Sequence, residues 1–236
     1  MMNAAQQFNQ LFITGQGPVR GKWLARIRRP ELLLVDAADE AGIAYGCDQD
    51  WYEDAWQRRA GCGPCTAASI MFYLGRSYPE LARLYSRGSG TQSDFSHLMH
   101  EVWQFVTPGR MGVNEAHMLS RGAEKYAGLK GLTLVGHEQK VPGLYQSRAP
   151  LPQLTQFIRQ GLEQDCPVAF LNLSNGSLDN LESWHWVTVT AMLRDPQDQI
   201  LLVISDSGEL KTVNMSQWFS SSLLGGALVY FSWGAN

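Results

Sequence analysis

The chain has 236 residues, of which 44% are hydrophobic and 17% are charged, and its formal net charge is -3. This composition excludes a disordered or fibrous protein, and a chain of this length can bury a full hydrophobic core without disulfides or metals. Because acidic side chains outnumber basic ones, no broad positive field is available to hold a phosphate backbone, and we expect no nucleic-acid partner.

The N-terminal segment has no long apolar run and no small-residue cleavage site, so it does not resemble a secretory signal. The longest apolar stretch, residues 223–233, is shorter than the roughly 20 residues that span a bilayer. We therefore expect no membrane segment and a cytoplasmic location, where structural disulfides are rare. The chain has four cysteines, Cys47, Cys62, Cys65 and Cys166. In such a setting cysteines point to catalytic or redox use.

The first part of the chain is predicted to be mainly helical. The run ELLLVDAA, from Glu31, predicts a strand, and the polar and aromatic segment 41–61 predicts a long ordered loop. From Cys62 to Leu74 the side chains are apolar on nearly every face, which predicts a buried helix that ends at Gly75. Apolar spacing predicts four further helices, at 79–85, 93–106, 114–126 and 151–164.

After residue 166 the apolar period becomes that of strands. The predicted strands are 167–173, 184–193, 199–204, 210–213 and 227–232. Helices followed by an antiparallel sheet are typical of an α+β fold, here with an N-terminal helical part packed on a C-terminal sheet. No linker is evident, so we expect one domain.

The sequence GCGPC, which contains Cys62 and Cys65, has two functional interpretations. In the first, the two thiols form a redox pair, because Cys-Gly-Pro-Cys is the active-site sequence of thioredoxin-like proteins. In the second, Cys62 is a nucleophile at a helix N-terminus, where unpaired N–H groups favour a thiolate. A thioredoxin-like site directly follows an apolar strand, whereas residues 54–60 are DAWQRRA. This favours the nucleophile, with Cys65 in the core. A non-functional alternative is that Cys62 is a small buried hydrophobic residue.

Two polar residues in the predicted strands could complete such a site. His185 lies in the strand SWHWVTVT and is the candidate general base, the alternative being an ordinary core histidine. Pairing Leu193 with Ile200 across a six-residue loop places Asp206 opposite Val187, on the face of His185. Asp206 could then fix the tautomer of the imidazole. The alternative is a turn aspartate.

The remaining histidines do not predict a metal site. His97 and His100 stand three residues apart beside Glu101, but the polar face of an amphipathic helix explains all three. Zinc requires four ligands at defined spacing, and the chain has a single C-x-x-C pair. We expect no metal and no cofactor.

CGP at the start of a buried helix, then HWVTVT, then a strand that ends in D-x-G, resembles the papain-like cysteine peptidases. Within that superfamily the pattern is most similar to the bacteriocin-processing (double-glycine leader) peptidases and their bacterial relatives. The resemblance covers residues 56–74 and 166–219. It implies one papain-like domain over residues 1–236, with an N-terminal extension over 1–45 and an insertion-like helical block over 78–141.

The resemblance implies a thiol hydrolase, most simply a peptidase that cleaves a peptide or amide substrate through an acyl-enzyme on Cys62. His185 would be the general base and Asp206 would orient it. Many papain-like enzymes place a glutamine before the cysteine to bind the oxyanion, and Gln57 is the candidate, with a surface-loop glutamine as the alternative. Three other functions stay open: an acyltransferase with the same triad, a dithiol oxidoreductase that uses Cys62 and Cys65, and a non-enzymatic papain-like binding module. The sequence does not predict the oligomeric state.

Overall fold

The computed structural model describes residues 6, 8–10, 21–37 and 42–234. Its main sheet contains β1 (Lys22–Arg26), β4 (Val135–Val141), β5 (Val168–Asn172), β6 (His185–Arg194), β7 (Ile200–Asp206), β8 (Glu209–Asn214) and β9 (Gly226–Ser232). The strand order is β4-β9-β5-β6-β7-β8, with β1 also paired to β6, and every pair is antiparallel. A small second sheet joins β2 (Leu34–Asp36) to β3 (Ile43–Tyr45).

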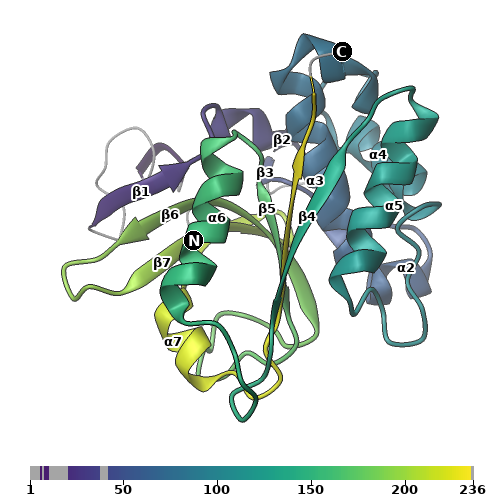
Figure 1. The fold of residues 1–236 in the computed structure, drawn as a ribbon. Coiled ribbons are helices and arrows are strands. Elements are labelled where there is room, and N and C mark those ends of the chain that lie inside the picture. The colour runs from purple at the N-terminus through teal and green to yellow at the C-terminus, as the bar shows by residue number, and fades with distance from the viewer. Residues whose placement is uncertain (1–5, 7, 11–20, 38–41, 235–236) are drawn as a thin grey trace.

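Helices cover both faces of the main sheet. The α-helices are α2 (Ala55–Ala60), α3 (Cys62–Ser77), α4 (Gln92–Trp103), α5 (Ala116–Leu129), α6 (Leu151–Glu163) and α7 (Met215–Ser221), and the 3-10 helices are η2 (Pro30–Leu33), η3 (Gln49–Trp51) and η4 (Pro79–Leu84). Figure 1 shows α3, α4 and α5 on one side of the sheet and α6 and α7 on the other. Among the described residues, no helix combines the length and the apolarity that crossing a membrane requires.

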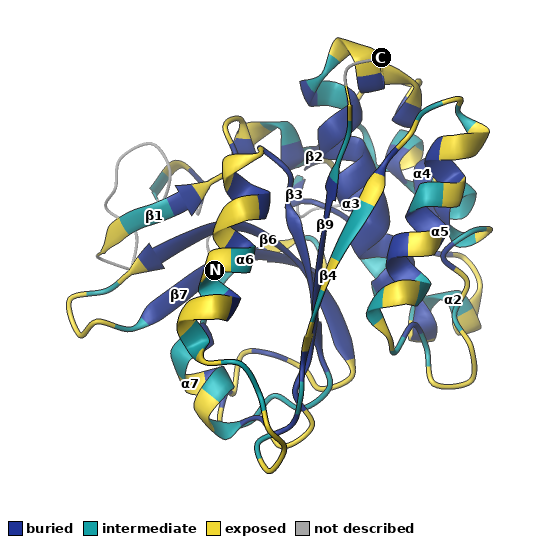
Figure 2. Ribbon diagram, viewed as in Figure 1, coloured by how far each residue is buried: buried dark blue, intermediate teal, exposed yellow. Residues whose placement is uncertain are grey.

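Alternate side chains of β5 point to opposite faces of the sheet, as the period of a strand requires. Phe170 contacts Trp218 of α7, with ring centroids 4.7 Å apart, whereas Leu171 lines a cavity that it shares with Cys62 of α3. Figure 2 shows that the central strands and α3 are the most deeply buried parts of the molecule. These features confirm the predicted α+β class, with helices packed on a mostly antiparallel sheet.

The predicted helices are present, with two differences. The helix predicted to end at Gly75 continues to Ser77. A Cβ at Gly75 would lie 2.9 Å from the backbone nitrogen of Tyr85, so this glycine allows a close approach of the following chain and does not end the helix. Segment 79–85 forms the 3-10 helix η4 rather than an α-helix.

Three other segments differ from their predictions. The run from Glu31 forms η2 and then only the short strand β2, because Pro30 starts a helical turn. The predicted loop 41–61 contains β3, η3 and α2. The block 78–141 ends in strand β4, whose sequence VGHEQKV is largely polar. This strand lies at an edge of the sheet and pairs only with β9 in the described residues, so few of its side chains need to be apolar.

The first 45 residues contribute directly to the sheet where the structure describes them. β1 pairs with residues 191–194 of β6, and β2 and β3 contribute Val35 and Tyr45 to the hydrophobic core. Residues 1–5, 7, 11–20 and 38–41 of the expected extension lie outside the described residues.

Candidate active site

Cys62 is the first residue of α3 and follows α2 after a single glycine, with its side chain partly exposed. The first-turn N–H groups of a helix have no partner within it, and they place a partial positive charge near the sulfur. Val113 packs against this turn so closely that a Cβ at Gly63 would lie 2.6 Å from the Cβ of Val113. The glycine after the cysteine is therefore needed for packing. The predicted start of the buried helix at Cys62 is confirmed.

The second cysteine of the motif has a different environment. Cys65 is 4% exposed, and all four cysteines are free thiols. Burial, followed by a hydrogen bond with Cys47, raises the pKa of Cys65 well above its ordinary value. Because the thiolate is the nucleophile, a thiol that stays protonated reacts slowly. The structure therefore favours Cys62 over Cys65 as the reactive thiol.

His185 and Asp206 meet at neighbouring ends of β6 and β7. His185 Nε2 lies 2.8 Å from Asp206 Oδ1, and both side chains are buried. Trp184, the residue before His185, has a φ of 59°, which is a strained conformation for a bulky residue. Such strain persists only where the surrounding structure holds it, and it is concentrated at functional sites.

The strand register that brings the two residues together differs from the predicted one at its far end. Leu193 pairs with Leu201, not with Ile200, so the predicted pairing is wrong near the loop. A β-bulge in the middle of β6 shifts the register by one residue, and beyond it Thr188 lies opposite Ser205. This is the register that the sequence-based pairing requires at the site end. The bulge therefore compensates for the wrong pairing near the loop. It places the carboxylate of Asp206 diagonally beside the imidazole of His185.

Hydrogen bonding determines the charge states of His185 and Asp206. Burial opposes the charged form of His185, but hydrogen bonds with Asp206 and Cys62 outweigh it and raise the pKa of His185 to about 10. Burial likewise opposes ionisation of Asp206, but His185 and Lys211 lower the pKa of Asp206 to about 2. Between these two values the pair is an imidazolium and a carboxylate. An imidazolium next to Cys62 favours the thiolate.

Lys211 is a site residue that the sequence analysis does not identify. Its Nζ lies 2.9 Å from Asp206 Oδ2 and 3.2 Å from Glu209 Oε2. Asp206 thus accepts from the imidazole on one oxygen and from the ammonium on the other. Ser207 and Gly208 both have positive φ and form a two-residue turn, which folds β8 back beside β7 and brings Lys211 to the carboxylate. The sequence DSGELK, an acidic strand end followed by a tight turn, was the available signal.

The two glutamines that most closely precede Cys62, Gln57 and Gln49, lie in different environments. Gln57 lies in α2, partly buried, and is not among the residues that line either cavity containing Cys62. Gln49 of η3 lines the smaller of these cavities together with Cys62 and His185. Its Oε1 is buried and has no hydrogen-bond partner among the described residues. Gln49, which stands 13 residues before the cysteine in the segment expected to be a loop, therefore shares the smaller cavity with Cys62, and Asn114 supplies a side-chain amide to the larger one.

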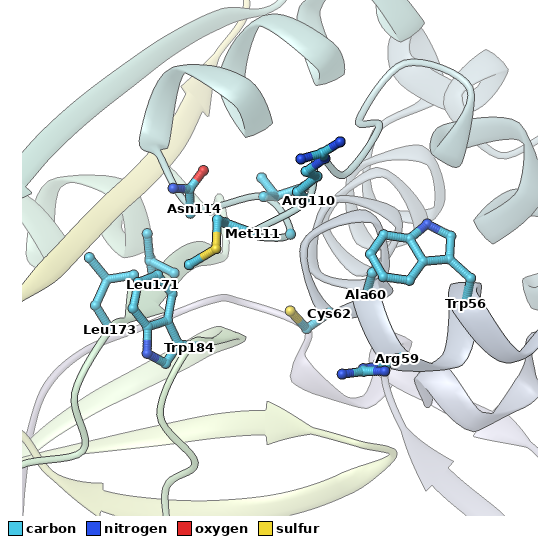
Figure 3. Close-up of a pocket in the computed structure, with 12 residues that line it drawn as sticks. Trp56, Arg59, Ala60, Cys62, Arg110, Met111, Asn114, Leu171, Leu173 and Trp184 are labelled. Carbon is cyan, nitrogen blue, oxygen red and sulfur yellow. The ribbon is translucent and has the colours of Figure 1, made fainter.

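Cys62 lies between two cavities. The smaller one, of about 10 Å³, is close to the volume that one water needs, and its lining includes Cys62, His185, Asp206 and Gln49 together with the buried Cys47 and Cys65. The larger one, of about 330 Å³, is shown in Figure 3 and is lined by residues of four segments: Trp56, Arg59, Ala60, Cys62, Arg110, Met111, Gly112, Val113, Asn114, Leu171, Leu173 and Trp184. An extended substrate could occupy the larger cavity with its reacting group beside the sulfur.

The other candidates take part in ordinary contacts. His97 forms an ion pair with Glu101 at 3.4 Å, and His100 stacks edge to face on Tyr52. Within the part of the chain that the structure describes, no group of three or more histidine, cysteine, aspartate or glutamate side chains could hold a metal ion.

Comparison with known proteins does not assign a function to this site. No known family matches the chain, and no match is found among curated proteins. The functional interpretation therefore depends on the geometry of the site and on the sequence motifs.

Proposed function

We propose that this protein is a papain-like cysteine hydrolase that cleaves an amide bond in a peptide substrate. One observation carries the proposal: an accessible thiol at the start of a buried helix shares a water-sized cavity with a buried histidine–aspartate pair. The sequence motifs around Cys62, His185 and Asp206 support the same assignment. Four free thiols, one of which the reaction needs in its reduced form, fit the expected cytoplasmic location.

In the acylation step, the Cys62 thiolate attacks the carbonyl carbon of the substrate, and a C–S bond forms as the carbonyl oxygen becomes an oxyanion. We assign the oxyanion donors to the backbone N–H of Cys62 and to the side-chain NH2 of Gln49, which lines the same small cavity. The His185 imidazolium gives its proton to the leaving nitrogen as the C–N bond breaks. The product is an amine and a thioester on Cys62.

In the second step, His185 is neutral and takes a proton from a water that attacks the thioester carbonyl. The C–S bond breaks, the carboxylic acid leaves, and the imidazolium and thiolate are restored. Asp206 stabilises the imidazolium and fixes the ring orientation in both steps. Lys211 holds Asp206 in place through the oxygen that does not contact His185.

The dithiol alternative is less compatible with the site. A redox pair requires the second cysteine to act as a resolving nucleophile, but Cys65 lies in the core and burial raises its pKa. That alternative also gives no role to the contact between His185 and Asp206.

A pH profile of alkylation tests the proposal. Wild type, Cys62→Ala, Cys65→Ala and His185→Ala are treated with iodoacetamide from pH 5 to 10, and the labelled cysteine is identified by mass spectrometry. We expect Cys62 to be labelled first at neutral pH. Loss of His185 should slow the labelling of Cys62 at neutral pH, because the thiolate loses its charged partner. Cys65→Ala should leave the profile in place.

The opposite pattern would exclude the hydrolase. If Cys65→Ala abolishes the reactivity of Cys62 while His185→Ala does not, or if mild oxidants link the two cysteines in a reversible disulfide needed for activity, the site is a dithiol centre. If the alkylation pattern supports the hydrolase, cleavage of a random peptide library by wild type, and not by Cys62→Ala, would identify the bond that is hydrolysed.

A further inference from the structure

Two arginines lie in the larger cavity with Cys62, and no aspartate or glutamate lines it among the described residues. Arg59 follows Trp56 by one helical turn in α2, and Arg110 belongs to the turn that precedes α5. Both are exposed, and neither guanidinium forms an ion pair with another described residue. The chain as a whole has a net charge of -3, so this positive charge is a local property of the cavity.

The fold holds Arg110 in place over the site. Gly109 and Gly112 exchange two backbone hydrogen bonds of 3.1 and 3.0 Å, so Arg110 and Met111 form the tip of a tight turn. Directly after the turn, the carbonyl of Val113 accepts a hydrogen bond from the indole of Trp186, the residue next to His185. The same valine packs on the first turn of α3. The turn is therefore anchored to both elements that carry the reacting side chains.

Most of the remaining side chains in the cavity wall are apolar, and Asn114 is polar. Leu171 and Leu173 come from β5 and the segment after it, and Trp184 stands beside them before β6. Figure 3 shows this group on one side of the Cys62 sulfur, with Arg59 and Trp56 on the other side. A substrate that spans the cavity would thus meet an apolar surface on one side of the thiol and positive charge on the other.

We infer that the hydrolase takes peptide substrates that carry a carboxylate on one side of the cleaved bond and a large apolar side chain on the other. This inference rests on the proposed function. Arginine binds carboxylates through parallel N–H donors, and among the described residues no acid that lines the cavity competes for either guanidinium. The apolar wall would bury an aliphatic or aromatic side chain, which removes apolar surface from water.

Matched alkylating reagents test the inference without a known substrate. Iodoacetate and iodoacetamide differ in charge, and the ratio of their second-order rate constants at Cys62 reports the local field. We expect this ratio to fall by about 3- to 10-fold in the double variant Arg59→Gln, Arg110→Gln, and by less in each single variant. Arg159→Gln, which makes the same charge change on α6, is the matched control and should keep the wild-type ratio.

A third alkylating reagent tests the apolar wall of the cavity. Iodoacetanilide adds a phenyl ring to the neutral reagent, and we expect Leu173→Asn to lower its rate relative to iodoacetamide while the ratio for iodoacetate is kept. Circular dichroism confirms that each variant is folded, and the single variants suffice if the double variant is not.

The outcomes separate this inference from the proposed function. If Cys62 is labelled fast at neutral pH but the arginine variants keep the wild-type charge ratio, the carboxylate preference is wrong and the hydrolase stands. An anilide ratio that Leu173→Asn does not change would exclude the apolar side. If iodoacetamide does not label Cys62 ahead of the other cysteines in wild type, the proposed function fails, and the substrate inference fails with it.

Discussion

Two buried aspartates of this molecule receive similar numbers of hydrogen bonds from different kinds of donor. Asp165 is 2% exposed and accepts from the backbone N–H of Arg28 at 2.6 Å and from the hydroxyls of Tyr73 and Tyr78 at 2.5 and 2.7 Å. Asp206 is 5% exposed, and its two main partners are His185 and Lys211.

The donors distinguish the two sites. Burial and then the bond to Asp165 raise the pKa of Tyr73 far above its ordinary value, so its hydroxyl is a neutral donor at every working pH. Asp165, which precedes β5, is therefore a fixed structural contact with α3 and with the segment that follows β1. The partners of Asp206 carry charge, and one of them lines a cavity with an accessible thiol. Burial is thus common to both carboxylates. What distinguishes Asp206 is a charged partner, His185, that lines a cavity with a thiol.

The largest effect is expected where Asp206 loses its charge. Asp206→Asn should lower amide turnover by about 10,000-fold, because the imidazolium loses both its partner and its orientation. The pKa of His185 should fall, so the alkaline loss of activity moves to lower pH. The measurement is kcat against pH on the peptide found in the library screen, with thermal unfolding as a check on folding. Turnover within tenfold of wild type would place Asp206 in the same structural class as Asp165.

The second largest loss of activity is expected when the side-chain amide donor is removed. Gln49→Ala should lower kcat by about 100- to 1,000-fold with a smaller change in KM, because the donor acts on charge that develops during the reaction. Gln57→Ala is the matched variant, since it removes the glutamine that the sequence predicts for this role. A larger loss in Gln57→Ala than in Gln49→Ala would restore the sequence-based assignment and remove Gln49 from the site.

Some residues of the candidate site could be predicted from the sequence and others could not. A cysteine at a helix start and a histidine in an apolar strand follow local patterns, so both were predictable together with the α+β class. Gln49 and Lys211 come to the site through a 3-10 helix and a tight turn, which local periodicity does not describe. The β-bulge in β6 has no clear signal in a run of alternating valines and threonines, and it decides which residues of β7 face His185.

Substitution of Asp165 should have the opposite effect to substitution of Asp206, with a loss of stability and no loss of reactivity. Asp165→Asn should lower the free energy of unfolding by about 3 kcal/mol, because an amide nitrogen replaces one acceptor oxygen and buried donors lose their partner. Alkylation of Cys62 per folded molecule should stay at the wild-type rate. Urea unfolding and the iodoacetamide assay measure the two quantities on the same sample. A loss of Cys62 reactivity without a loss of stability would contradict the division between the two aspartates.

Lys211 should produce the smallest effect, and that effect should depend on pH. Its side chain is 31% exposed and helps to keep the pKa of Asp206 near 2, below the ordinary value of 3.8. A carboxylate with a lowered pKa contributes stability that is complete above 3.8 and is lost as the pH falls through about 2. In Lys211→Gln the pKa of Asp206 should rise, so acid unfolding begins at a higher pH.

Turnover of the same variant at neutral pH should fall by less than about tenfold, since Asp206 stays ionised there and keeps its bond to His185. Acid titration followed by tryptophan fluorescence measures the midpoint, and Arg159→Gln serves again as a variant that removes a positive charge far from the site. An unchanged acid midpoint together with a large loss of turnover would mean that Lys211 acts on the reaction itself and not through the charge of Asp206.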